Sequence, residues 1–225
     1  MARDFPPVTS PVVEQFVTSG TFRLDGGEWE VDNNVYLVAD EASNSVIVID
    51  PAHEPDTITA KVGDRSVRAI VLTHAHNDHC DLAPELAKRW GVDVYLHPDD
   101  DVLWKESNGE APYVPIDVED PLWAQWSLML HHTPGHTPGC VVIEVLDADN
   151  ADGEATNVLL SGDTLFNGGP GATGRKYSSF ETIIESLKNV VFELPHSMMV
   201  LPGHGDATTI GAEAARIDEY IERGY

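Results

Sequence analysis

The stretch "VLTHAHNDHCD", from Val71 to Asp81, limits what this chain can fold into more than any other feature. It places three histidines and two aspartates at the end of the apolar run "VRAIVLT". A continuous apolar run is typical of a strand covered on both faces, so the polar cluster begins where a buried strand ends. So many imidazoles and carboxylates suit neither a plain solvent loop nor an apolar core. They indicate a binding site at a strand end.

Strands and helices are mixed along the rest of the first half. The β-branched runs "VVEQFV", "NNVYLVAD" and "SVIVID" predict strands, and "LDGGEWE" predicts a hairpin-like turn. Helical spacing over "DLAPELAKRWG" ends at Gly91 and is followed by a strand, "VDVYLH". The segment from Pro98 to Pro121 is rich in Pro, Asp and Glu, so we expect irregular structure with one helical turn near "DDVLWKE".

The second half repeats this mixture. Strands are expected over "WSLMLHH", "CVVIEVL", "NVLLSG" and "SMMVLPG", and helices over "SSFETIIESLKNVVFEL" and "GAEAARIDEYIER". The polar segment "DADNADGEATN" is expected to be a hairpin loop. No linker or tandem repeat divides the chain, so we expect residues 1–225 to form one α/β domain with sheets sandwiched between helices.

Charge and composition narrow the classes of partner. The chain has 13 Lys and Arg against 38 Asp and Glu, a net charge of −25. Such a surface repels phosphate backbones, so nucleic acid is not an expected partner. No apolar run approaches the roughly 18 residues of a membrane span, and the amino end lacks an export signal. With only two cysteines, the chain is expected in a reducing cytoplasm.

Four loops carry the candidate metal ligands, each after an apolar run: "THAHNDHC", "HTPGHTPG", "SGDTLF" and "LPGHGD". Imidazole and carboxylate together suit zinc or iron, whereas calcium and magnesium prefer oxygen ligands. His74 and His76 need a bend to converge on one ion. Asp78 and His79 then lie beyond that bend, where they are positioned for a second ion.

Other residues admit ordinary roles. The two similar tetrapeptides of "HTPGHTPG" leave the choice between His132 and His136 open. Cys80 stands beside the cluster as a ligand, a nucleophile or simply a packed side chain, of which the last is the commonest use of a free cysteine. The remaining histidines are interpreted as surface or hydrogen-bonded residues: His53, His97, His131 and His196.

The order of these loops resembles the metallo-β-lactamase superfamily, whose first motif has the form H-x-H-x-D-H. The resemblance runs from Asp50 in "VIDP" to His204. It implies an αββα sandwich, two mixed sheets flanked by helices, with a binuclear site at one edge. By this resemblance one metal is bound by His74, His76 and His136, the other by Asp78, His79 and His204, with Asp163 bridging both. Asp50 then orients the ligands, and Asp78 and Asp163 are the catalytic carboxylates.

Within the superfamily, "SGDTLFNGG" resembles the glyoxalase II-type thioesterases (hydroxyacylglutathione hydrolase type). True β-lactamases usually have Cys or Ser where Asp163 stands, and the nucleases carry an inserted domain for which Asp163 and His204 lie too close. The resemblance implies hydrolysis of a small thioester. Two divalent ions, zinc with iron or manganese as alternatives, lower the pKa of a shared water and yield a bridging hydroxide. A thiolate leaving group needs no strong acid.

Two other functions compete with this hypothesis. A persulfide dioxygenase shares the fold but uses a single iron and O₂. A binding protein with a structural metal is a rival from another class, although such proteins normally lose ligands. The complete second ligand set favours the hydrolase over both.

The stretch "GATGRKYSSF" supplies the candidate substrate contacts. Glyoxalase II has a Gly-Lys-aromatic-Tyr stretch here, whose Lys and Tyr contact glutathione. By that resemblance Arg175 takes the Lys position, Tyr177 the Tyr position and Lys176 the aromatic one. The alternative is that Ser178 or Ser179 caps a helix and the cations face solvent. The chain ends about one helix after His204, where glyoxalase II has a helical domain, so the carrier stays open among glutathione, mycothiol and coenzyme A.

Overall fold

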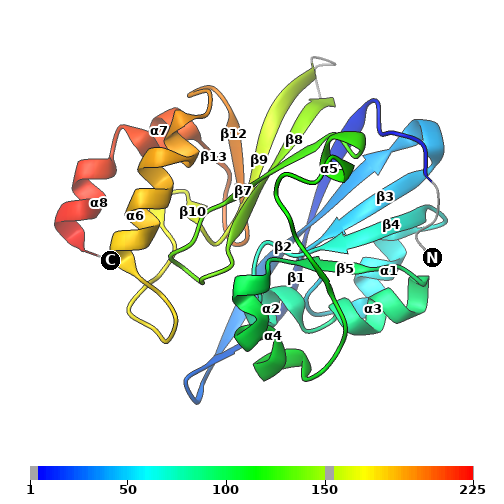
Figure 1. Cartoon of the computed structure of the whole chain (residues 1–225), viewed down its shortest axis with the longest axis horizontal. Helices are drawn as coiled ribbons and strands as arrows, with labels where there is room; N and C mark the ends of the chain where they lie inside the picture. Colours follow the sequence, from blue (N-terminus) through cyan, green and yellow to red (C-terminus); the bar gives the residue numbers. More distant parts are fainter. Residues whose placement is uncertain (1–4, 150–154, 225) are drawn as a thin grey trace.

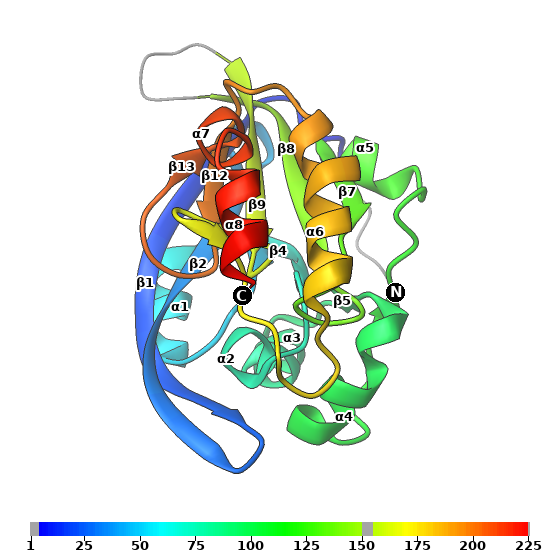
Figure 2. The ribbon, with the colours of Figure 1, turned by 90° about the vertical axis from the view of Figure 1, so that its left-hand side faces the viewer.

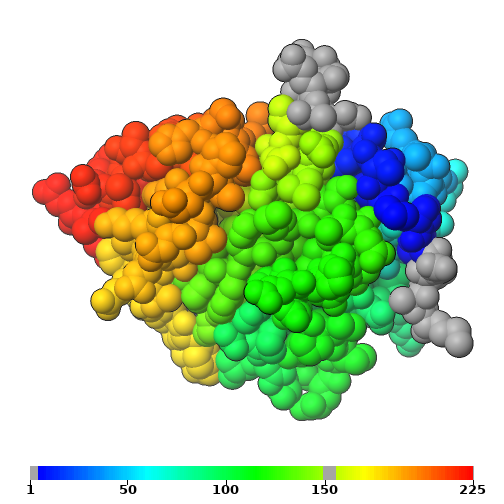
Figure 3. Space-filling model, turned by 45° about the horizontal axis from the view of Figure 1, so that its top comes forward, coloured from blue at the N-terminus to red at the C-terminus, as the bar shows by residue number. Residues whose placement is uncertain are grey.

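The computed structural model describes residues 5–149 and 155–224. Two mixed sheets face each other, and helices cover their outer faces (Figure 1). The hydrogen-bonded path runs through both sheets, but a single residue pair, Val12 with Asp149, joins them. The predicted αββα architecture is therefore confirmed. The chain ends lie on opposite sides of the sandwich, as the separation of blue and red atoms also shows (Figure 3).

The first sheet takes most of its strands from the first half of the chain. Its strands, in sheet order, are β1 (Pro11–Leu24), β2 (Gly27–Asp40), β3 (Ser45–Ile49), β4 (Ser66–Val71), β5 (Val94–Leu96) and β6 (Val114–Pro115). Every residue of β3 is buried, and its side chains alternate between two cores. Val46 and Val48 face the outer helices, whereas Ile47 and Ile49 face the second sheet. This explains why Val46 to Ile49 are all apolar.

The second sheet is built from later strands. They are β7 (Leu128–His132), β8 (Val141–Asp149), β9 (Ala155–Gly162), β12 (Met199–Pro202) and β13 (Thr208–Thr209). A separate two-stranded ribbon consists of β10 (Leu165–Phe166) and β11 (Gly169–Pro170). Strands β8 and β9 extend into the segment predicted as a polar loop, of which residues 150–154 lie outside the described part.

Helices close both outer faces. The first sheet is covered by α1 (Pro55–Val62), α3 (Ala83–Trp90) and α4 (Asp101–Asn108), and the second by α6 (Phe180–Asn189), α7 (Ile210–Ala214) and α8 (Ile217–Arg223). The short helices α2 (Asn77–Cys80) and α5 (Leu122–Gln125) lie in connections. Three separate apolar clusters fill the two helix–sheet layers and the space between the sheets. In the described part, no helix has the length and apolar character to cross a membrane.

Several helices differ from the sequence expectations. Helix α4 has two turns rather than one. The predicted helix before β12 ends at Asn189 and continues only as a 3₁₀ turn. The predicted closing helix is divided at Arg216, whose backbone leaves helical geometry. Helix α1 was not predicted, because the β-branched residues in "PDTITAKV" weaken its helical pattern.

The β1–β2 hairpin extends well beyond the rest of its sheet (Figure 2). The predicted turn is present, because Asp25 and Gly26 both take positive φ between Leu24 and Gly27. The free end of this ribbon carries Phe22 and Trp29, whose ring centroids lie 5.7 Å apart. The hairpin therefore brings aromatic side chains to the edge where the histidine loops gather.

Candidate metal centre

Three histidines from two loops form the first ligand group. His74 Nε2 lies 3.1 Å from His76 Nδ1, and His136 Nε2 lies 2.9 Å from the same atom. All three side chains are buried. His74 and His76 follow β4, and His136 follows β7, so the ends of strands from both sheets meet here. Three nitrogens this close match the separation of ligands around one ion.

Hydrogen bonds on the far side of the rings fix which nitrogens face the centre. His136 Nδ1 donates to the carbonyl of Ala172 at 2.8 Å. His74 Nδ1 lies 3.1 Å from Thr73 Oγ1, whose own proton goes to Asp50. Each of these histidines therefore keeps an unprotonated Nε2 directed inward, which is the usual support for a metal-binding imidazole.

The second ligand group combines a carboxylate with two histidines. His204 Nε2 lies 3.3 Å from Asp78 Oδ2 and 3.3 Å from His79 Nε2. His79 Nδ1 donates to Asp50 at 3.0 Å, and His204 Nδ1 donates to the carbonyl of Asp32 at 2.7 Å. As in the first group, the outward nitrogens are occupied and the inward ones converge.

Asp163 stands between the two groups. Its Oδ1 lies 3.3 Å from His79 Nε2, and its Oδ2 lies 3.5 Å from His136 Nε2. The same Oδ2 lies 3.6 Å from His204 Nε2, so the carboxylate lies beside ligand atoms of both groups. Buried carboxylate oxygens without a hydrogen-bond partner occur at both Asp163 (Oδ1) and Asp78 (Oδ1). Because an unpaired buried anionic oxygen is costly, the donor set fits cations as the missing partners.

The titration of the histidines differs between the groups. Burial lowers the pKa of His74 well below its ordinary value and lowers the pKa of His76 to about 3, so both are neutral at pH 7. Burial also acts to lower the pKa of His79 and His204, but the carboxylates of Asp163 and Asp78 outweigh it and raise both pKa values. Without metal, protons are therefore favoured on His79 and His204 over His74 and His76.

Asp50 forms hydrogen bonds that connect both ligand groups: to Thr73, which contacts His74, and to His79. Its Oδ1 accepts from the backbone N–H of Thr73 at 2.7 Å, and its Oδ2 accepts from Thr73 Oγ1 at 2.6 Å and from His79 Nδ1. The residue lies at the end of β3 with a φ of 50°, a conformation that non-glycine residues seldom adopt. Its position is the one expected of a residue that orients the ligands.

Asp100 is a second such residue, which the sequence analysis missed. Its side chain is fully buried and accepts three hydrogen bonds: from Ala75 N at 2.9 Å, from Thr137 Oγ1 at 2.8 Å and from Gly139 N at 2.6 Å. Burial nevertheless raises the pKa of Asp100. These bonds join the loop of His74 to the loop of His136. Nothing in the acidic stretch "HPDDD" distinguishes this aspartate from its neighbours.

A third group of possible ligands, His97, Asp99 and His132, is less suited to a metal. The rings of His97 and His132 are stacked, with centroids 4.0 Å apart and planes inclined by 16°. Imidazole lone pairs lie in the ring plane, so parallel rings do not direct them to one point. His132 Nε2 also bonds the carbonyl of Pro138 at 2.8 Å. The structure thus brings His136, and not His132, to the other ligands.

Cys80 packs behind the ligand loops. Its thiol is buried, lies 3.5 Å from the carbonyl of Ala75 and accepts a bond from Asn108 at 3.2 Å. Burial raises its pKa well above the ordinary value, so the thiol stays protonated at neutral pH. These contacts favour the packing role over a nucleophile.

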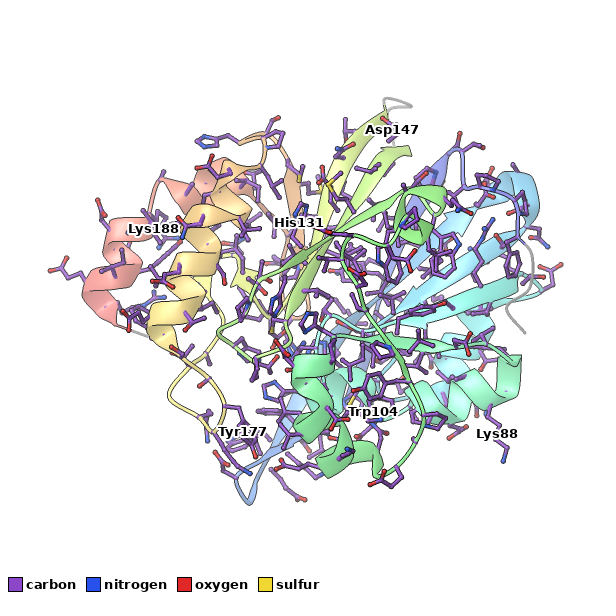
Figure 4. All side chains as sticks on the ribbon, in the orientation of Figure 1. Lys88, Trp104, His131, Asp147, Tyr177 and Lys188 are labelled. Atoms are coloured by element: carbon purple, nitrogen blue, oxygen red, sulfur yellow. The ribbon has the colours of Figure 1, made fainter. Side chains whose placement is uncertain are left out.

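The stretch Arg175–Tyr177 contacts α4 and the β1–β2 hairpin, and Tyr177 lies on that side of the molecule (Figure 4). Lys176 Nζ pairs with Glu106 at 2.8 Å, and the Tyr177 hydroxyl lies 3.4 Å from the same carboxylate. The Arg175 guanidinium lies 4.9 Å from the centre of the Trp29 ring. Ser179 also caps α6, as its side chain accepts from Thr182 N. Both interpretations of "GATGRKYSSF" thus have contacts that support them.

The fold and the site together define an αββα protein with a buried histidine and aspartate cluster able to bind metal. Residues 29–204 match the model of the metallo-β-lactamase superfamily, and the chain belongs to that superfamily. It is 35% identical over 196 residues to an uncharacterized protein of Aquifex aeolicus, covering 81% of this chain and 89% of the relative. It is 29% identical over 198 residues to the hydroxyacylglutathione hydrolase GloC of Haemophilus influenzae, and the match covers 80% of this chain and 89% of the relative.

A solved structure agrees with this family. The structure of TTHA1623 in a di-iron-bound form has a TM-score of 0.69 with 31% sequence identity, and the match covers 82% of this chain and 93% of the other. The predicted family is therefore confirmed. An iron-bound relative also means that family membership alone leaves the native metal open.

Proposed function

We propose that this protein is a two-metal hydrolase that cleaves thioesters of a small carrier thiol. The observation that carries the proposal is the position of Asp163, whose carboxylate lies within 3.6 Å of His79 and His204 of one group and within 3.5 Å of His136 of the other. A carboxylate in that position could contact two ions, one in each group. Two bound ions would lower the pKa of water and polarise a carbonyl, which is the chemistry that thioester hydrolysis needs.

The residues of the chain position this chemistry. His74, His76 and His136 would hold one ion, and Asp78, His79 and His204 the other. Asp50 and Asp100 keep the ligand loops in place through hydrogen bonds. No acid is required for the leaving group, since a thiol with a pKa of about 8.5 departs as the thiolate.

A cavity beside His76 offers a place for the substrate. It has a volume of about 150 Å³ and is lined by residues of β1, α2, α4 and the His76 loop, among them Leu24, His76, Leu103 and Glu106. Glu106 also pairs with Lys176 and lies 3.4 Å from the Tyr177 hydroxyl, so both residues contact the wall of this cavity at Glu106. In the described part, no carboxylate lies within ion-pair distance of Arg175, which leaves its guanidinium able to bind an anionic carrier.

The experiment is a hydrolysis screen with metal-loaded protein over thioesters of glutathione, mycothiol and coenzyme A, with the matching oxygen esters as controls. We expect turnover of at least one thioester and slower cleavage of its oxygen ester. O₂ uptake with a persulfide, by protein containing one iron per chain, would instead establish the dioxygenase alternative. Full metal loading without any turnover would favour a binding protein.

A further inference from the structure

Asn33 of β2 lies inside the second ligand group, although no histidine or aspartate motif includes it. Its Nδ2 lies 3.2 Å from Asp78 Oδ2, 3.4 Å from His79 Nε2 and 3.5 Å from His204 Nε2. The side chain is 1% exposed. The amide thus touches all three ligand atoms of the group at once.

The four atoms have the dimensions of a metal coordination shell. The three ligand atoms are separated from each other by 3.3, 3.3 and 3.8 Å. Together with the three distances to the Asn33 amide, they outline a nearly regular tetrahedron. The centre of a tetrahedron with edges of about 3.4 Å lies about 2.1 Å from each corner, which is the length of zinc–nitrogen and zinc–oxygen bonds.

The amide has two orientations that exchange its nitrogen and oxygen positions, and the surroundings decide between them. As placed, the nitrogen faces the site and donates to Asp78, while Oδ1 faces away, buried and without a hydrogen-bond partner. Because Oδ1 accepts no hydrogen bond in its present position, only the contacts of the site-facing nitrogen favour this orientation. A cation at the centre would repel the amide hydrogens and attract the carbonyl oxygen.

We propose that Asn33 turns its amide on metal binding and supplies its side-chain oxygen as a further ligand of the second ion. This inference rests on the proposed two-metal site, in which Asp163 would contact the same ion. Beside Asp78, His79, His204 and Asp163, the neutral Asn33 oxygen would be a fifth protein donor, and it would not add to the negative charge of the two aspartates. It would also explain why a polar side chain is buried at this point of β2.

The test measures metal binding rather than activity. Zn²⁺ and Co²⁺ are titrated by calorimetry into metal-free wild-type protein and into Asn33→Ala, Asn33→Asp and Asn157→Ala. Asn157 is the matched control, because its amide bonds Glu144 on the edge of the sandwich away from the centre. In Asn33→Ala we expect the affinity for the second ion to fall by at least about tenfold, with the first ion unaffected. Asn33→Asp should retain the second ion, since a carboxylate oxygen replaces the carbonyl.

The visible spectrum of the Co²⁺ protein provides a second readout, because its d–d bands depend on the coordination number. We expect these bands to change in Asn33→Ala and to stay close to wild type in Asn157→Ala. If wild type binds two ions and Asn33→Ala binds both with equal affinity, Asn33 is not a ligand. If Asn33→Asp loses the second ion as Asn33→Ala does, the amide acts only as a hydrogen-bond donor to Asp78. A wild-type protein that binds one ion overturns the two-metal proposal and this inference together.

Discussion

Replacing Asp100 with asparagine should loosen the first metal site without touching a ligand. The carboxylate accepts two bonds at Oδ2, from Ala75 N and Thr137 Oγ1, and one at Oδ1, from Gly139 N. An asparagine keeps one acceptor oxygen, so its NH₂ group must face at least one N–H donor. Losing one buried hydrogen bond to a charged group costs about 1.5–3 kcal/mol of folding free energy.

The same substitution should weaken metal binding at one site only. Asp100 joins the loops of His74 and His136, which belong to the first ligand group. Supporting residues of this kind typically contribute tenfold to hundredfold in metal affinity, and we expect a loss of about that size for the first ion. The second ion should bind as in wild type. Competition with a chromophoric chelator measures both affinities, and urea unfolding of the metal-free protein measures stability.

Thr137→Val is the matched control for this prediction. It removes one donor to Asp100 but leaves the two backbone bonds that tie the loops together. Its effect on the first ion should therefore be clearly smaller than that of Asp100→Asn. Unchanged stability and unchanged metal affinity in Asp100→Asn would refute the argument, as would an equal loss at both sites.

Three further predictions concern the centre and the substrate. Asp163→Asn should lower the catalytic rate by orders of magnitude with a smaller effect on folding, and near-normal turnover in a fully metallated variant would contradict the bridging role. Arg175→Ala should raise KM for the best thioester by about tenfold to a hundredfold with unchanged metal content, because a charge-assisted bond contributes roughly 1.5–3 kcal/mol. If KM stays unchanged in both Arg175→Ala and Tyr177→Phe, this stretch does not bind the substrate. The raised pKa values of His79 and His204 mean that protons compete with the second ion for these side chains. Acidification below pH 7 should therefore release the second ion before the first. The metal content after dialysis across a pH series measures this.

The sequence predicted the architecture because its signals were local. The buried strands β3 and β4 consist mostly of apolar residues, and the turn at Asp25 and Gly26 follows from residues that tolerate positive φ. Helix α1 was not predicted because its local signal pointed to the wrong structure: its Thr, Ile and Val residues have strand propensity. Packing against the first sheet, where Ile58 and Val62 are buried, decides its conformation instead.

The sequence predicted the histidines and aspartates that gather at the centre but not the residues around them. Histidines and aspartates in four loops form a recognisable order, whereas Asn33 and Asp100 belong to no motif. Their partners are distant in the sequence: Asn33 meets His204 across 171 positions, and Asp100 meets Gly139 across 39. Such contacts depend on how the two sheets bring their strand ends together, which the local pattern of residues does not encode.

The measurement that most directly tests the two-metal proposal is the metal content of protein purified without added metal, compared among wild type, His79→Ala and His204→Ala. The proposal predicts about two transition-metal ions per chain in wild type, about one in each variant, and most of the thioesterase activity lost with the second ion. One iron per chain in wild type, or two ions at full occupancy in both variants, would contradict it.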